Sequence, residues 1–344
     1  MTTSASRNFD LNGLVRISLE AAPRYCSYFD NEYQRISSDH LAEGAPVVTL
    51  KIVEKLLRDD TREIHYKDLF RFRFAAYDLD TSHPTIEFES HWLDRFYTTA
   101  VGAFVQGQLL EPVIYLMLLR SDVLFMHAAG VSKNGKGFVF PAHGGTGKTT
   151  LSLALMRMGF DLMGDDLMMV EAKTGVVHPY ARPLHLFNYN LKTLKVPLGV
   201  RAAIGLKDVI RTAIALVTGK KFLISTRAHA DEIMDVQMGK PSQLAAVVFL
   251  KREGAEESFD LSDPVAMEQA AAMVIKSADL NTSLEEHFGA QADIAKLEAS
   301  VVKSVLKHVP NMSAINARLM KDNADRAEFA EAYLGKLPDA AHDA

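Results

Sequence analysis

The sequence is poor in cysteine and tryptophan and has no strong excess of charge of either sign. Cys26 is the single cysteine among 344 residues, which excludes an internal disulfide and a zinc site built from several cysteines. This cysteine usage fits a reducing compartment, and we expect a cytoplasmic protein. The formal net charge of −5 argues against a general nucleic-acid-binding protein, because phosphate-backbone binding needs a clustered basic surface.

Long hydrophobic runs are also missing. The most apolar stretch, Leu109–Leu119, contains Glu111 and Pro112 and is far shorter than the ~20 residues that a membrane-spanning helix requires. The first residues, Met-Thr-Thr-Ser-Ala-Ser-Arg, lack the apolar segment of a secretory signal. We therefore expect no membrane partner. Hydrophobic residues at 48% and charged residues at 24% are typical of a soluble globular protein, here with two or three compact units.

Three segments differ in their patterns. Residues 1–100 contain short alternating apolar runs and polar turns, which predict a mixed α+β N-terminal region. Residues 101–260 begin with an expected buried helix over Val101–Leu119 and continue as an α/β core. Residues 261–344 are rich in Ala, Glu, Lys and Leu, and Pro264–Tyr333 is expected to be mostly helical.

Charge is uneven along the chain. Residues 190–240 contain nine Lys/Arg against four Asp/Glu, whereas residues 255–344 contain eight against sixteen. These stretches are either the solvated faces of different modules or, for the basic one, a surface beside a phosphate site that receives an anionic substrate.

The centre of the α/β core is a glycine-rich loop between an expected strand and an expected helix. The strand is Gly137–Pro141, preceded by a turn at 133–137. After the loop, Leu151, Leu155 and Met158 share one helical face, and Gly159 can end that helix. Further strands are expected over Asp161–Gly164, Leu167–Val170 and Leu244–Leu250.

The loop itself, Ala142-His143-Gly144-Gly145-Thr146-Gly147-Lys148-Thr149, matches the P-loop pattern except that Ala replaces the first Gly. Glycines let backbone N–H groups approach phosphates without interference from Cβ atoms. Lys148 is expected to contact the β/γ-phosphates and Thr149 to ligate Mg²⁺, while the helix N-terminus faces the same anion. The expected phosphate-binding residues are Gly144, Gly145, Thr146, Gly147, Lys148, Thr149 and Thr150.

Two adjacent carboxylates, Asp165 and Asp166, are expected to return to this loop. The helix from Thr149 to Met158 runs ~15 Å away from the loop at ~1.5 Å per residue. The extended segment Phe160–Gly164 then recovers about 16 Å at ~3.3 Å per residue. Two carboxylates beside a triphosphate need a metal between them, so one is expected to hold Mg²⁺ while the other accepts a proton from an attacking hydroxyl.

His127 is a third candidate, at the end of the apolar run Val123–Met126. This run is expected to form a strand one hairpin before the strand that leads into the loop. Such a position puts His127 at one end of the sheet, although strand register decides which end.

Together these features resemble the HPr kinase/phosphorylase family, which shares its fold with phosphoenolpyruvate carboxykinase. The run carrying the resemblance is a His, a short hairpin, a P-loop, a helix ending at Gly and a paired Asp, here from His127 to Asp166. The resemblance implies an α/β kinase core of that type, with Asp165 as catalytic base, Asp166 placing the metal and His127 lying near the transferred phosphate. The two Asp roles remain interchangeable on the sequence. The family also suggests a homo-oligomer.

A short segment after the paired Asp, Ala181-Arg182-Pro183-Leu184, resembles one found in HPr-kinase-like proteins. Arg182 is expected either to clamp a phosphate or an acidic acceptor or to form a structural salt bridge. Basic residues that flank the later strand, Lys240, Lys251 and Arg252, are weaker candidates.

The sequence thus predicts an ATP- and Mg²⁺-dependent kinase that phosphorylates a hydroxyl of a small metabolite or a protein serine. Two alternatives stay open. One is a nucleotide-dependent ATPase or switch, which needs an attacking water in place of an acceptor, and the other is a regulator that binds nucleotide without turnover.

Overall fold

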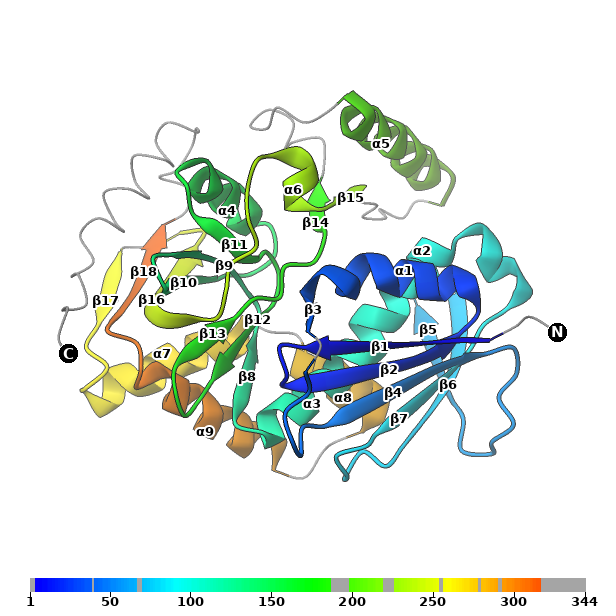
Figure 1. Ribbon diagram of the computed structural model, residues 1–344, viewed down its shortest axis with the longest axis horizontal. Helices are drawn as coiled ribbons and strands as arrows, with labels where there is room; N and C mark the ends of the chain where they lie inside the picture. Colours follow the sequence, from blue (N-terminus) through cyan, green and yellow to red (C-terminus); the bar gives the residue numbers. More distant parts are fainter. Residues whose placement is uncertain are drawn as a thin grey trace. The chain divides into compact units, whose positions relative to one another are not determined.

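A computed structural model describes residues 4–38, 40–66, 70–186, 198–218, 226–253, 256–277, 280–289 and 293–316. The protein is mixed α/β, and its sheets contain both parallel and antiparallel strands (Figure 1). The chain forms two compact units. Unit 1 consists of Met1–Met126, Met169–Gly175 and Pro264–His308, and unit 2 of His127–Met168, Val176–Asp263 and Val309–Ala344.

This division differs from the three consecutive segments expected from the sequence. The helices that follow Pro264 belong to the same unit as the N-terminal residues, and the chain then returns to unit 2 after His308. Sequence patterning identifies helices and strands but carries no signal for which distant segments share a core, and the difference follows from this.

Unit 1 is built on a seven-stranded sheet with the order β3-β1-β2-β4-β7-β6-β5. One face of this sheet is buried. In β2, for example, Val15, Ile17 and Leu19 are buried and alternate with Arg16 and Glu20. The strands of unit 1 are β1 (Ala5–Leu11), β2 (Val15–Ala21), β3 (Ser37–Ser38), β4 (Val47–Val53), β5 (Arg62–Tyr66), β6 (Phe70–Tyr77), β7 (Thr85–Glu89) and β8 (Val123–Met126). The chain passes between the units within β12 (Met168–Glu171).

Helices complete unit 1. They are α1 (Pro23–Tyr33), η1 (Gln34–Ile36), η2 (Trp92–Phe96), α2 (Thr98–Phe104), η3 (Val105–Leu110), α3 (Glu111–Arg120), α7 (Pro264–Lys276), α8 (Leu280–Phe288) and α9 (Ile294–Leu306). The helix expected over Val101–Leu119 is confirmed as part of a continuous helical stretch, Thr98–Arg120, which includes a π-helical turn.

The stretch Thr98–Arg120 is longer than the sequence suggested, and among the described residues it is the one helix long and apolar enough to cross a membrane. However, 83% of its apolar window is buried inside the protein. Ile114 and Tyr115, in its C-terminal third, are buried in unit 1, as is usual for a core helix.

Unit 2 contains the strands β9 (Ala128–Lys133), β10 (Lys136–Pro141), β11 (Asp161–Gly164), β13 (Val176–His178), β14 (Leu184–Leu186), β15 (Thr226–Ala228), β16 (Ser242–Lys251), β17 (Glu257–Phe259) and β18 (Asn311–Asn316). Its helices are α4 (Lys148–Arg157), α5 (Leu198–Thr218) and α6 (Ala230–Ile233). The order β11-β9-β10-β16 runs inward from one edge of its sheet, where β10 and β16 run parallel and β9 is antiparallel to both β10 and β11.

The core of unit 2 lies between this sheet and α4 (Figure 1). Leu151 and Leu155, one helical turn apart on α4, are buried with Val131 of β9, Phe140 of β10 and Val248 of β16. The expected helix after the loop and the expected strand Leu244–Leu250 are therefore confirmed. This packing fixes the start of α4 beside the end of β10.

Two expectations near the ends of unit 2 were wrong. The residues between His127 and the turn form a separate strand, β9, so β9 rather than β8 makes the hairpin with β10. The turn residues Asn134 and Gly135 have φ values of 53° and 74°, as the type I′ turn of a two-residue hairpin requires. At the other end, Asn311–Asn316 forms strand β18 rather than continuing the predicted helical tail, and 317–333 lies outside the described residues.

Candidate active site

The register of three strands brings the sequence-predicted residues to one end of the sheet in unit 2. Pro141 at the end of β10 pairs with Ala128 at the start of β9, and Gly164 at the end of β11 pairs with Gly130. The backbone N–H of Ala128 also donates to the carbonyl oxygen of Asp166 at 3.1 Å. The loop after β10, the residue before β9 and the pair after β11 therefore meet.

The conformation of the Gly-rich loop is set by a hydrogen bond within the loop and by a glycine at its end. Thr146 donates its hydroxyl to the carbonyl oxygen of His143 at 2.7 Å, which closes a turn around Gly144 and Gly145. Gly147 stands directly before α4 with a φ of 113°, in the left-handed region that favours glycine.

Helix α4 begins at Lys148 and has no side-chain cap. The N–H groups of its first turn, which includes Thr149 and the half-buried Thr150, precede the first helical carbonyl acceptors, so they are available to an external anion.

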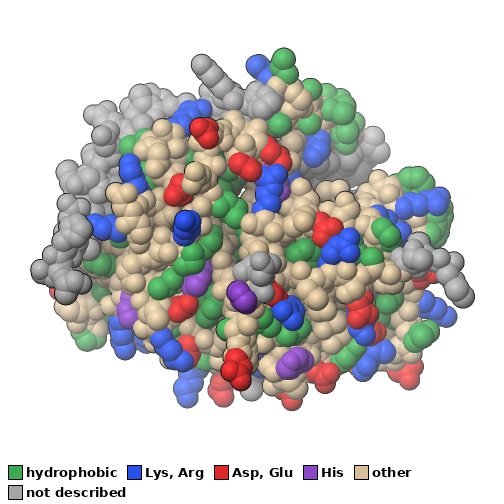
Figure 2. Space-filling view, viewed as in Figure 1, with side chains coloured by type: hydrophobic (Ala, Val, Ile, Leu, Met, Phe, Trp, Pro, Cys, Tyr) green, Lys and Arg blue, Asp and Glu red, His purple; other side chains and the backbone are tan. Residues whose placement is uncertain are grey.

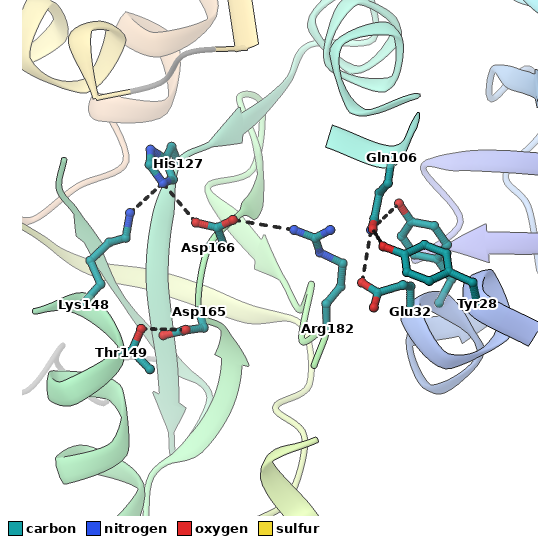
Figure 3. A network of polar contacts seen from close by, with 10 residues as sticks. Tyr28, Glu32, Gln106, His127, Lys148, Thr149, Asp165, Asp166 and Arg182 are labelled. Carbon is teal, nitrogen blue, oxygen red and sulfur yellow. Dashed lines mark hydrogen bonds and ion pairs between the residues drawn. The ribbon is translucent and has the colours of Figure 1, made fainter. Parts of the chain in front are cut away.

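Lys148 is buried, which is unusual for a lysine, and its ammonium group lies in a cluster of polar groups (Figure 3). Its Nζ donates to the carbonyl oxygen of Ala142 at 3.0 Å and lies 2.7 Å from Nε2 of His127. The same Nε2 lies 3.0 Å from Oδ1 of Asp166.

These two contacts of His127 compete with each other. Nε2 accepts a hydrogen bond from Lys148 only when it carries no proton, and it donates to Asp166 only when it does. A single imidazole nitrogen therefore serves one partner at a time. The movement of Lys148 toward an anion would release His127 to bond fully with Asp166.

The two aspartates have different surroundings. Asp165 accepts a hydrogen bond from the Thr149 hydroxyl at 2.8 Å through Oδ2, while its Oδ1 is buried with no hydrogen-bond partner among the described residues. Burial, reinforced by the charge of Asp166, raises the pKa of Asp165 to about 6, although Thr149, Lys148 and His127 act in the opposite direction.

Asp166 is more exposed, and its side chain retains 53% of its accessible surface. Loss of solvation is the largest single influence and acts to raise its pKa. The hydrogen bond and charge of His127, together with the charges of Lys148 and Arg182, outweigh it. The net result holds the pKa of Asp166 well below its usual range. The surroundings of these two adjacent carboxyls thus shift their pKa values in opposite directions.

Arg182 lies beside Asp166, a position compatible with either of the two roles expected from the sequence. Its Nη2 lies 3.7 Å from Oδ2 of Asp166 (Figure 3). Its guanidinium carbon lies 5.2 Å from the ring centre of Tyr180.

Arg252, a weaker candidate in the sequence, contacts the Gly-rich loop directly. Its Nη2 donates to the carbonyl oxygen of Gly144 at 2.5 Å and lies 3.1 Å from where a Cβ at Gly145 would be. Strand β16 brings it there, because Leu250 bridges to Ala142 in parallel. Arg252 directly follows β16, and β16 runs parallel to β10. The carboxyl ends of parallel strands share one edge of a sheet, so a residue after β16 lies near the loop after β10.

The residues present fit a Mg²⁺ ion together with phosphate. The described residues contain no group of three or more His, Cys, Asp or Glu side chains that could hold a metal alone. A magnesium site built on one hydroxyl, one or two carboxylates and substrate phosphates needs no such group. Thr149, Asp166 and the unpartnered Oδ1 of Asp165 supply oxygen ligands of the kind that Mg²⁺ prefers.

Comparison with known proteins adds no family assignment. No protein-family model matches the sequence, and no curated protein matches it.

Proposed function

We propose that the protein is an ATP-dependent phosphotransferase that moves the γ-phosphate of ATP to a hydroxyl group, with an HPr-kinase-like arrangement of its site. The observation that carries the proposal is that residues from three separate segments meet in an arrangement typical of a kinase site. Lys148 and Thr149 open a helix after the Gly-rich loop, His127 precedes β9, and Asp165 and Asp166 follow β11.

The loop and the first turn of α4 are proposed to hold the triphosphate. Backbone N–H groups around Gly144–Thr150 would bind phosphate oxygens, and Lys148 would turn from His127 to the β/γ-phosphates. Bound Mg²⁺ supplies positive charge between the phosphates and the carboxylates. Thr149 and Asp166 are the proposed residues of its site.

The difference between the two aspartates supports Asp165 as the base, an assignment that the sequence left open. A general base works best when its pKa lies near the working pH, and burial brings Asp165 to about 6. Asp166, held in its ionised form, suits a cation. Two neighbouring carboxyls with divergent pKa values are a common basis for divided roles.

The proposed step is a single displacement. The acceptor oxygen forms a bond to the γ-phosphorus, the bond from that phosphorus to the β–γ bridging oxygen breaks, and ADP leaves. The hydroxyl proton moves to a carboxylate oxygen of Asp165. His127 and Arg182 are proposed to stabilise the charge on the transferred group or the acceptor.

The test is transfer of label from γ-labelled ATP, with Mg²⁺, to a panel of hydroxyl metabolites and to proteins of a cell lysate. Acceptor-dependent transfer that is lost in Lys148→Met and reduced about 10²-fold or more in Asp165→Asn supports the proposal. Asp263→Asn, at an exposed position, is the matched control. Hydrolysis without acceptor dependence would instead identify an ATPase or switch, and nucleotide binding without turnover would identify a regulator.

A further inference from the structure

Helix α5 of unit 2 turns its apolar side outward. Leu206 and Val209 are 62% and 66% exposed, and Leu198, Ile210 and Leu216 are exposed as well. At about 100° per residue these five positions fall within about 120° of one another, so they share one face of the helix. Figure 2 shows hydrophobic side chains gathered over the part of the surface where Figure 1 places α5.

The opposite side of α5 faces its own unit with a mixed set of residues. Ile204 is buried there, and Lys207 and Asp208 are half-buried. Within unit 2, α5 contacts strand β15. A surface helix ordinarily does the reverse, burying its apolar stripe and exposing its charged residues. An outward apolar stripe of this length indicates a docking surface.

The charge of the sequence segment that contains α5 indicates what docks there. Residues 190–228 contain eight Lys/Arg and a single acidic residue, Asp208, in a chain whose net charge is −5. The rest of the chain therefore carries a net charge of −12. Within the helix, Arg201 is exposed near the apolar stripe, and in the sequence Lys195 and Lys220 lie just outside its two ends.

We propose that α5 is a membrane-surface helix that lies in the interface of an anionic lipid bilayer. An apolar stripe with basic residues along and beside it is the pattern of helices that enter the headgroup region. The four charged residues of α5 (Arg201, Lys207, Asp208 and Arg211) exclude a membrane span, in keeping with its absence from the candidate spans among the described helices.

A second copy of the chain is a poorer occupant of this surface. Two copies of α5 would bring equal, strongly basic segments together, and like charges repel. Anionic headgroups neutralise the same segments. The sequence-based expectation of no membrane partner considered spanning helices and secretion signals, whereas a peripheral contact needs one face of one helix.

The experiment is co-sedimentation of the full chain with vesicles of phosphatidylcholine, with and without phosphatidylserine. We expect binding to the phosphatidylserine vesicles that weakens by about tenfold or more when salt is raised from low to high concentration, because surface charge is screened. The double variant Leu206→Gln/Val209→Gln should lose about tenfold or more in binding, because it removes the centre of the apolar stripe. Leu57→Gln/Val265→Gln is the matched control, since it changes an exposed Leu and Val of unit 1.

Several results would overturn the proposal. Failure of the wild-type chain to bind anionic vesicles is one, and equal binding to vesicles with and without phosphatidylserine is another. An oligomer that the α5 double variant converts to monomer, with no vesicle binding by the wild type, would assign the stripe to a second copy. Circular dichroism spectra establish whether both double variants are folded. Equal losses of vesicle binding in the two variants would show that α5 is not the membrane-binding element. None of these outcomes depends on whether the protein transfers phosphate.

Discussion

Replacing Asp165 by Asn should stabilise the nucleotide-free protein, and the gain should depend on pH. Burial raises the pKa of this carboxyl from 3.8 to about 6, so the folded protein holds a proton that the unfolded chain has already lost between these two values. A group with a raised carboxyl pKa favours folding at low pH, and its contribution is lost as pH rises through the folded value. At about 1.4 kcal/mol per pH unit, this amounts to at most about 3 kcal/mol by pH 7.

The pH dependence separates charge from packing. Asn has nearly the shape of a protonated Asp and can still accept the hydroxyl of Thr149, so constant differences in packing affect the comparison equally at every pH. Below about pH 3 both proteins carry a neutral group in their folded and unfolded states, and their difference in unfolding free energy reflects packing alone. Between pH 4 and pH 7 that difference should grow in favour of Asp165→Asn by about 1–3 kcal/mol.

Chemical denaturation followed by circular dichroism, in buffer with a chelator and no nucleotide, measures this difference at several pH values. For a unit of this size, about 1 kcal/mol also corresponds to a shift of about 2–4 °C in Tm. Asp263→Asn again serves as the exposed control. A difference between wild type and Asp165→Asn that is the same at pH 4 and pH 7 would refute the reasoning, since it would show that burial does not disfavour the Asp165 carboxylate.

Four further substitutions test other parts of the structure. Lys148→Met keeps the buried stem but removes the ammonium, so calorimetry should show ATP affinity at least about tenfold weaker, with the fold unchanged. Gly147→Ala forces a side chain to a φ of 113°, and denaturation should show a loss of about 1–3 kcal/mol. Gly164→Ala would place a Cβ 2.7 Å from the carbonyl oxygen of Leu167, so phosphate transfer should fall more than ATP affinity as the following carboxyls shift. Glu298→Gln should gain stability over wild type as pH rises above 4.5, because burial raises the pKa of this carboxyl, and pH-dependent denaturation measures the gain.

Local features of the fold were predictable because they depend on neighbours in sequence. The helix after the loop, the strand Leu244–Leu250 and the helix over Val101–Leu119 are confirmed, since each has a clear period or a continuous apolar run. Strand β9 escaped prediction because Ala128–Lys133 has no alternating pattern, being mostly buried on both faces between β10 and β11. Strand β18 escaped because it adds to the edge of β16 from more than 50 residues away.

The residues of the candidate site that lie close in sequence to the Gly-rich loop could be predicted. Backbone lengths placed Asp165 and Asp166 level with Lys148, and the contact of Asp165 with Thr149 agrees with this expectation. Arg252 could not be placed in the same way, since its position depends on β16 running parallel to β10. The opposite pKa shifts of the two aspartates could not be predicted from the sequence either, because they arise from burial and from the side chains of His127 and Arg182.

The incomplete hydrogen bonding around Lys148 favours a binding role for this cluster over a structural one. A structural cluster would be expected to satisfy each buried polar group, because unpaired ones are costly in a low-dielectric interior. Here Lys148 and Asp166 compete for one nitrogen of His127, Oδ1 of Asp165 is buried with no hydrogen bond among the described residues, and α4 begins without a side-chain cap. Local conflicts of this kind concentrate at functional sites, where a ligand resolves them. An anion at the start of α4 with a cation beside Asp165 would relieve all three at once, and a nucleotide phosphate with Mg²⁺ has this chemistry.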